Sequence, residues 1–139
     1  MNTAWCGEVV RGKGAVALLA LRLVAGPAFI LHGWTKIQHA FTWLGPQVPS
    51  WLQALAAFAE FGGGIAILIG LLTRLAALGI ACVMSYAIFL VHLPSGDPFV
   101  GQGGSWELAA IYLAIMIALM LRGAGSVSLD AVLCKSKRS

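Results

Sequence analysis

Hydrophobic residues are gathered in four long runs, and each run has about the length of a helix that crosses a bilayer. The runs cover residues 15–39, 51–72, 75–93 and 105–122. A membrane-spanning helix needs about 20 predominantly apolar residues, within a range of about 17–25. The segments between the runs are short, and none has the length of a linker between two domains. The pattern therefore predicts an all-α fold, an integral membrane four-helix bundle that forms one domain over residues 1–139.

The composition also indicates a membrane protein. Of 139 residues, 60% are hydrophobic and 10% are charged, whereas soluble domains have about 45–50% apolar and about 25% charged residues. Arg11 and Lys13 precede the first run in the way that basic residues precede the apolar core of a signal peptide. That core is only about 7–15 residues long and is followed by a cleavage site of small residues. Because the first run continues beyond Pro27, we expect it to be retained as a helix.

Basic residues at the ends of the runs predict the orientation. They lie before the first run, between the second and third, and after the fourth: Arg11, Lys13, Arg74, Arg122, Lys135, Lys137 and Arg138. The two intervening loops, residues 42–50 and 94–105, contain no lysine or arginine. By the positive-inside rule we expect both termini in the cytoplasm, in a multi-pass protein of the inner membrane. The same basic residues explain the net charge of +4, which we interpret as contact with anionic lipid and not as nucleic-acid binding.

Polar and small residues inside the runs fall on particular helix faces. At about 100° per residue, five positions of the first run share one face: Arg22, Gly26, Phe29, Gly33 and Lys36. The stripe of the second run is Glu60, Gly64, Ile67 and Arg74, and that of the fourth is Glu107, Ile111, Ala114 and Ala118. A row of small residues also predicts close helix packing: Gly62, Ala66 and Gly70. We expect all of these stripes to face neighbouring helices.

Five polar residues are predicted to form one polar funnel that opens toward the outside: His32, Lys36, Glu60, His92 and Glu107. At 1.5 Å per residue, His32 and Glu60 lie roughly 10–14 Å below the outer surface, so they can be neighbours. The other three residues lie near the outer boundary. All five are candidates for ligand binding or proton relay, because ionisable residues inside a membrane are functional by default.

Each candidate also has a structural interpretation. An ionised Glu60 costs about 2.5–3.5 kcal/mol at a helix centre, so it is expected to pair with Lys36 or His32, or to serve as a ligand or proton site. His32 could equally hydrogen-bond a neighbouring helix, and the three boundary residues could reach the interface or cap a helix. Arg22 could reach the headgroups or an internal carbonyl or acid, and we interpret Arg22 and Arg74 as structural. Four tryptophans are expected in an outer aromatic belt: Trp34, Trp43, Trp51 and Trp106.

Three motifs resemble those of the DoxX family of small bacterial and archaeal membrane proteins. They are "HGWTK" at 32–36, "EFGGGIAILIGLLTR" at 60–74 and "GAGSVSLD" at 123–130. The resemblance extends over about residues 21–133, with Ala124 where the family usually has proline. Family members are named for a subunit of a quinol oxidase or of a thiosulfate:quinone oxidoreductase. The resemblance implies a membrane oxidoreductase complex, and it brings no agreed catalytic residues to this chain.

The resemblance and the polar residues together predict a quinone-interacting or accessory subunit of such a complex. Quinone chemistry moves protons with electrons, so a histidine and an acid beside an apolar site suit a quinone head group. The chain has no C-x-x-C pair, with cysteines at positions 6, 82 and 134, and no dinucleotide-binding glycine motif. Haem is disfavoured because His32 lies well below His92, although His39 with His92 stays open. We predict no intrinsic cofactor and no metal, with partner subunits or a homo-oligomer completing the protein.

Two other classes of function remain open. One is a small-solute or proton-coupled transporter or binding module, with Lys36, His32 and Glu60 as its polar site. Four helices are few for alternating access, so this class would need a dimer. The other is a structural membrane adaptor, in which the buried polar residues only hold helices together.

Overall fold

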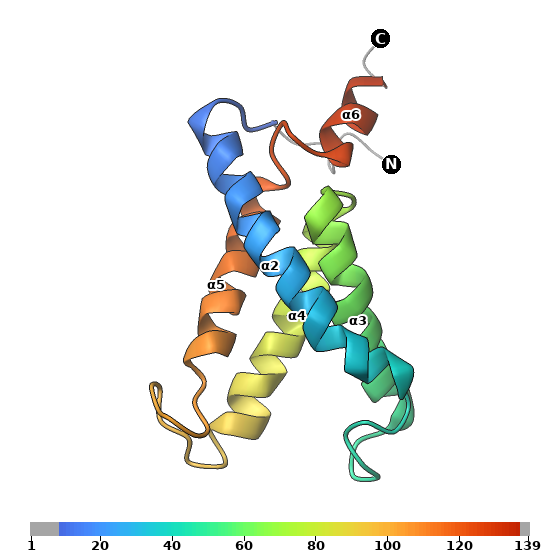
Figure 1. Ribbon diagram of the computed structural model, residues 1–139, viewed down its shortest axis with the longest axis vertical. Helices are drawn as coiled ribbons and strands as arrows, with labels where there is room; N and C mark the ends of the chain where they lie inside the picture. The colour runs from blue at the N-terminus through green and yellow to red at the C-terminus, as the bar shows by residue number, and fades with distance from the viewer. Residues whose placement is uncertain (1–8, 137–139) are drawn as a thin grey trace.

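The computed structural model describes residues 9–136, and only the backbone of residues 135 and 136. Within this part of the chain it contains helices and loops but no β-strand, which confirms the all-α class. The elements are α2 (Lys13–Gln38), α3 (Ser50–Ile69), α4 (Thr73–Tyr86), its continuation as the π-helix η1 (Ala87–His92), α5 (Glu107–Arg122) and α6 (Leu129–Ser136), as shown in Figure 1. Cys6, Lys137 and Arg138 lie outside the described residues.

Three helical segments of the described chain are long and apolar enough to cross a membrane. They are Lys13–Gln38, Ser50–Ile69 and Thr73–His92. The fourth predicted span corresponds to α5, which has 16 residues and is slightly shorter than the usual range of about 17–25. The chain is therefore a membrane protein with three candidate spans, and a fourth span through α5 stays a prediction.

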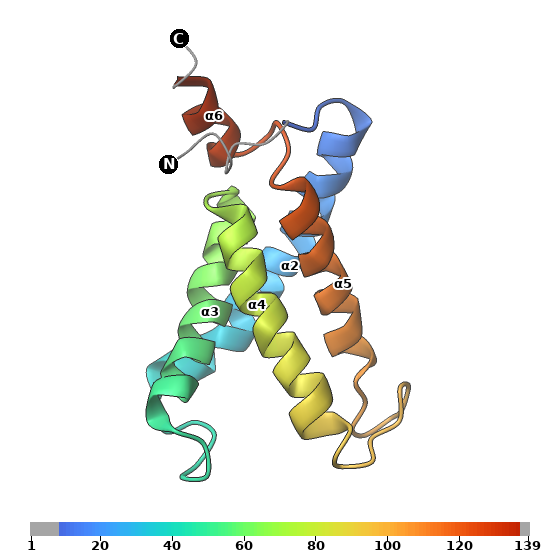
Figure 2. The same ribbon diagram turned by 180° about the vertical axis from the view of Figure 1, so that it is seen from behind.

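The long helices run alternately in opposite directions, and consecutive helices pack on each other (Figures 1 and 2). The start of α2, the turn between α3 and α4, the end of α5 and α6 lie at one end of the molecule, called here the terminal end. Residues 39–49 and 93–106 connect the helices at the opposite end, called here the loop end. The side of the membrane on which each end lies stays a prediction from the loop charges.

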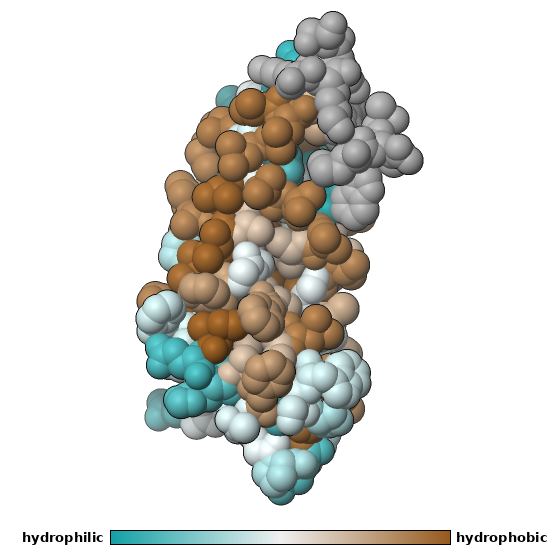
Figure 3. Space-filling view, turned by 90° about the vertical axis from the view of Figure 1, so that its right-hand side faces the viewer, coloured by the Kyte–Doolittle hydropathy of each residue, from teal (hydrophilic) through white to brown (hydrophobic). Residues whose placement is uncertain are grey.

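The outer surface of the bundle is strongly apolar. Figure 3 shows one face on which hydrophobic side chains cover most of the described surface and polar ones gather toward the loop end. Each long helix exposes large apolar side chains, for example Val24, Phe58, Leu78 and Leu121. A surface of this extent suits contact with lipid, because soluble monomers rarely expose such large contiguous apolar patches.

Glycines allow α2 and α3 to approach each other backbone to backbone. A Cβ atom added at Gly33 would lie 2.5 Å from the backbone nitrogen of Phe61, and one added at Gly64 would lie 2.7 Å from the nitrogen of Ile30. At Gly26 an added Cβ would lie 2.8 Å from the Cβ of Leu68. Residues 22, 26, 29 and 33 of the predicted α2 stripe are buried, so this face was predicted correctly. The same holds for residues 60, 64 and 67 of α3.

The predicted row of small residues is buried only at Gly70, and the predicted face of α5 is wrong. Gly62 is exposed, and a Cβ added there would have no atom within 4 Å. Since helical residues are about 100° apart, Gly62 lies about 200° from Gly64 and points away from α2. In α5, Ile111 and Ala114 are exposed, whereas Met116 is buried. The buried face of α5 was predicted from the position of Glu107. An acidic side chain in the first turn is stabilised by the helix dipole, so its position does not indicate which face of the helix is buried.

Candidate functional site

Arg22 joins three segments at the terminal end. Its side chain is buried, and its guanidinium donates to backbone carbonyls only in the described structure. Nε donates to Ile67 O at 2.8 Å and Nη2 to Leu68 O at 2.9 Å, both in the last turn of α3. Nη1 donates to Ala124 O at 2.9 Å and to Val127 O at 2.7 Å, beyond the end of α5. The sequence allowed Arg22 to reach either the headgroups or an internal partner. The structure shows the internal route, to backbone carbonyls in the last turn of α3 and beyond the end of α5.

The "GAGSVSLD" motif has a structural role beside Arg22. The Asp130 carboxylate accepts hydrogen bonds from the backbone N–H groups of Leu72 and Thr73, at 2.8 and 3.0 Å, and so caps the start of α4. Ser128 Oγ accepts from Ala131 N at 3.1 Å and caps α6. Helix α6 lies beyond the fourth apolar run, where the sequence pattern predicts no helix. Arg74 makes a longer contact at the surface, from Nη2 to Leu121 O at 3.5 Å.

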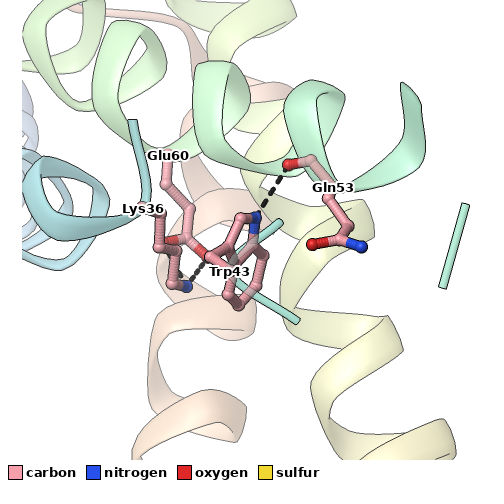
Figure 4. Close-up of polar contacts among 4 residues, drawn as sticks. All are labelled: Lys36, Trp43, Gln53 and Glu60. Carbon is pink, nitrogen blue, oxygen red and sulfur yellow. Dashed lines mark hydrogen bonds and ion pairs between the residues drawn. The ribbon is translucent and has the colours of Figure 1, made fainter. Parts of the chain in front are cut away.

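Lys36 and Glu60 form a close ion pair toward the loop end (Figure 4). Lys36 Nζ lies 2.6 Å from each oxygen of the Glu60 carboxylate. The Glu60 side chain is 1% exposed and that of Lys36 is 25% exposed. The pair joins α2 to α3. Among the alternatives that the sequence left open for Glu60, the structure shows the ion pair with Lys36.

Trp43 covers this ion pair from the loop between α2 and α3. The centre of its ring lies 4.6 Å from Lys36 Nζ, within the range of a cation–π contact. Its indole Nε1 donates to the backbone oxygen of Gln53 at 3.0 Å, as Figure 4 shows. The buried Gln53 amide holds the same loop, because it accepts from Leu44 N and donates to the oxygens of Gly45 and Val48. Sequence reasoning missed this role, although a glutamine inside an apolar run was a visible signal.

His32 lies on another side of α2, toward α5. Its side chain is exposed, and its ring centre lies 6.5 Å from those of both Phe29 and Tyr112. The Phe29 and Tyr112 rings are 4.9 Å apart at an angle of 59°. We call the place where these three residues meet the α2–α5 seam. The structure thus gives His32 and Glu60 different neighbours, because Lys36 reaches α3 with its long side chain while the imidazole lies against α5.

His92 has a partner that the sequence analysis did not consider. Its Nδ1 lies 2.7 Å from an Asp97 oxygen, and the backbone N–H of Asp97 donates to His92 O at 3.1 Å. Gly104 leaves room for this carboxylate, since an added Cβ would lie 2.5 Å from Asp97 Oδ1. Glu107 begins α5, where its backbone N–H donates to Phe99 O at 3.0 Å. The structure therefore divides the five residues of the predicted polar funnel. Lys36 and Glu60 form the ion pair, His32 lies in the seam, and His92 and Glu107 stand at the two ends of the 93–106 loop.

The described residues contain no group of three or more His, Cys, Asp and Glu side chains that could hold a metal ion. The ion pair and the Arg22 bonds hold helices together, whereas the seam presents an imidazole and a phenol beside aromatic rings.

The chain thus has long apolar helices, a buried arginine that donates hydrogen bonds to backbone carbonyls, and a lysine–glutamate ion pair between two helices. These features are typical of an integral membrane protein with several spans. The family is settled by comparison: the DoxX family model matches residues 17–93. The chain belongs to the DoxX family, as its motifs predicted.

Curated relatives cover most of the chain. The "Putative oxidoreductase CatD" of Bacillus subtilis is 30% identical over 89% of this chain and 92% of its own length. The "Inner membrane protein YqjF" of Escherichia coli is 33% identical over 86% of this chain and 94% of its own length. An uncharacterized protein of Haemophilus influenzae is 32% identical over 81% of this chain and 87% of its own length. No solved structure matches the chain significantly.

Proposed function

We propose that this DoxX-family protein is a quinone-interacting accessory subunit of a membrane oxidoreductase complex. The observation that carries the proposal is the exposed imidazole of His32 on α2, one of the candidate spans. At 1.5 Å per residue, the six residues from 32 to 38 place it roughly 9 Å from the end of α2. Hydrocarbon cannot hydrogen-bond an imidazole, so a ligand or another subunit is needed to satisfy the ring at this depth.

A quinone suits this position better than a charged solute. Its head group is flat and apolar, and its carbonyl oxygens accept hydrogen bonds such as an imidazole N–H can donate. Its isoprenoid tail stays in the lipid that the exposed side of α2 faces. The name of the Bacillus subtilis relative, a putative oxidoreductase, supports the same class of function.

The transport alternative has less support from the geometry. A solute or proton site at Glu60 would need a carboxylate that is free to bind, whereas both of its oxygens lie 2.6 Å from Lys36 Nζ. The centre of the Trp43 ring also lies 4.6 Å from that Nζ atom. This arrangement supports a structural role for the pair.

The accessory role follows from the sequence. The chain has neither a C-x-x-C pair nor a dinucleotide-binding glycine motif, so we propose that a partner subunit or a second copy supplies the electron carrier. We also propose that α5 forms a fourth span and that both termini are cytoplasmic. Trp106 and Arg122 at the ends of α5 suit the two membrane interfaces.

Quinone retention after purification tests the proposal. We expect the wild-type protein, purified in mild detergent and extracted with organic solvent, to carry quinone that is identified by its ultraviolet spectrum. His32→Ala should lose most of it, since the variant removes the exposed imidazole. His39→Ala is the matched control, because His39 is also exposed but lies beyond the end of α2.

Circular dichroism shows whether each preparation is folded. A folded wild-type protein that carries no quinone and binds none when it is added would overturn the proposal. A structural adaptor would then be the better description of the chain.

A further inference from the structure

The two helices that flank the bundle on the side of His32 diverge toward the loop end. In Figures 1 and 2, α2 and α5 are closest in the part nearer the terminal end and separate in opposite directions below it. α2 contacts α5 much less than it contacts α3. The Phe29 ring of α2 and the Tyr112 ring of α5 nevertheless contact each other, with their centres 4.9 Å apart.

His32 and Tyr112 lie at similar distances from the loop end. At 1.5 Å per residue, His32 lies roughly 9 Å from the last residue of α2 and Tyr112 lies roughly 8 Å from the first residue of α5. Their rings are 6.5 Å apart, nearly perpendicular at 78°. Two polar side chains from different helices thus meet at one depth.

Both polar groups of the seam have unused hydrogen-bonding capacity. Among the described residues, neither the His32 imidazole nor the Tyr112 hydroxyl makes a hydrogen bond to the protein. A neutral imidazole has one donor and one acceptor nitrogen, and a phenol both donates and accepts. The pair can therefore bind a quinone, which offers two acceptors, and also the corresponding quinol, which offers two hydroxyl groups.

The surroundings of the seam match the rest of such a ligand. The half-buried Tyr112 ring, held against the buried Phe29 ring, provides an aromatic face beside which a flat head group can pack. Exposed aliphatic side chains flank the seam on both helices, with Leu31 at 73% and Ile111 at 48%. A long apolar tail can remain among these side chains and the adjoining lipid while only the head group enters.

We propose that the α2–α5 seam is the site of the quinone head group, that the ligand enters sideways from the lipid, and that the Tyr112 hydroxyl is its second hydrogen-bonding partner beside His32. This inference rests on the proposed function and specifies its site. It places the ligand against α5 and separates it from the Lys36–Glu60 pair, which lies against α3.

The experiment uses the full chain in lipid nanodiscs and a short-tailed benzoquinone whose head group carries a photoreactive azide. Binding is measured first, and the cross-linked peptides are then identified by mass spectrometry. We expect labels around residues 28–32 of α2 and 108–113 of α5. Tyr112→Phe keeps the ring and removes one hydrogen bond, so it should weaken binding by about two- to tenfold. Tyr86→Phe, on α4, is the matched control and should bind like the wild type.

The outcomes separate the site from the function. If the wild-type protein binds no benzoquinone, the proposed function fails. If it binds, but Tyr112→Phe binds equally well and the labels lie on α3 around Glu60, the seam is wrong and quinone interaction stands. Weaker binding by Tyr112→Phe with labels on α2 and α5 supports the seam.

Discussion

Helix α2 meets its two neighbours in opposite ways. Against α3 it packs backbone to backbone, because Gly33 and Gly64 leave no room for a side chain. Against α5 it makes an aromatic contact at Phe29 and then diverges, leaving His32 exposed. The α2–α3 contact is close at several glycine positions, whereas α2 and α5 diverge toward the loop end (Figures 1 and 2).

Polar groups also join α2 to α3 toward both ends of this close contact. Arg22 donates four hydrogen bonds to carbonyls at the terminal end, and Lys36 pairs with Glu60 toward the loop end. Each buried charge has its partners within the protein, as burial requires. The His32 imidazole has none among the described residues. The polar residues of α2 thus differ by the neighbouring helix that they face: those that reach α3 hold helices together, whereas we propose that His32, toward α5, binds a ligand.

The largest expected effect comes from filling the close contact. Gly64→Leu would place a branched side chain where even a Cβ lies 2.7 Å from the backbone of Ile30, and backbone cannot move aside as a flexible side chain can. We expect the variant to lose the folded state, measured as failure to purify as a monodisperse species. Overpacking usually costs about 1–3 kcal/mol where a core can adjust, and we expect Gly64→Leu to exceed this range because the obstacle is backbone and the side chain is three carbon atoms larger than a Cβ.

Gly62→Leu is the matched control for this substitution. It inserts the same side chain two residues away, where nothing lies within 4 Å of an added Cβ, so it should purify and melt like the wild type. Equal behaviour of the two variants would contradict the close contact between α2 and α3.

The second effect comes from breaking the ion pair. Lys36→Met leaves the buried Glu60 carboxylate without its cation, and removing one partner of a buried pair typically costs about 3–5 kcal/mol. The melting temperature in detergent should therefore fall clearly. Combining it with Glu60→Gln should restore part of the loss, because the uncompensated charge is then gone. If the melting temperature of the double variant falls by the sum of the falls seen in the two single variants, the two side chains do not interact as the structure shows.

Much of the close contact could be predicted from the sequence. Helical periodicity alone places residues 22, 26, 29 and 33 on one face, and all four are buried. Helix length and rise place Lys36 within reach of Glu60. These features depend only on the geometry inside one helix and on the depth of each residue in the membrane.

The loops and the side of α2 that faces α5 could not be predicted in this way. Whether His32 faces α3 or α5 depends on how the helices are arranged around α2, which no single-helix pattern contains. Asp97 reaches His92 only through the path of a glycine-containing loop. Helix α6 is too short to show an apolar period, and its position depends on capping by Ser128 and on the bonds of Asp130.

The smallest effect on stability is expected for a substitution in the α2–α5 seam, and it tests directly whether the two sides of α2 differ. His32→Leu replaces an exposed imidazole that makes no hydrogen bond to the described residues, so without quinone it should melt within a few degrees of the wild type, as surface substitutions usually do. Added quinone should stabilise the wild type, by about 2.7 kcal/mol at a free concentration 100 times Kd, and should stabilise His32→Leu less, because that variant has lost one hydrogen bond to the ligand. Both are measured by thermal unfolding in detergent with and without a short-tailed quinone. A loss of stability as large as that of Lys36→Met would instead make His32 a structural residue, and the two sides of α2 would then not differ in kind.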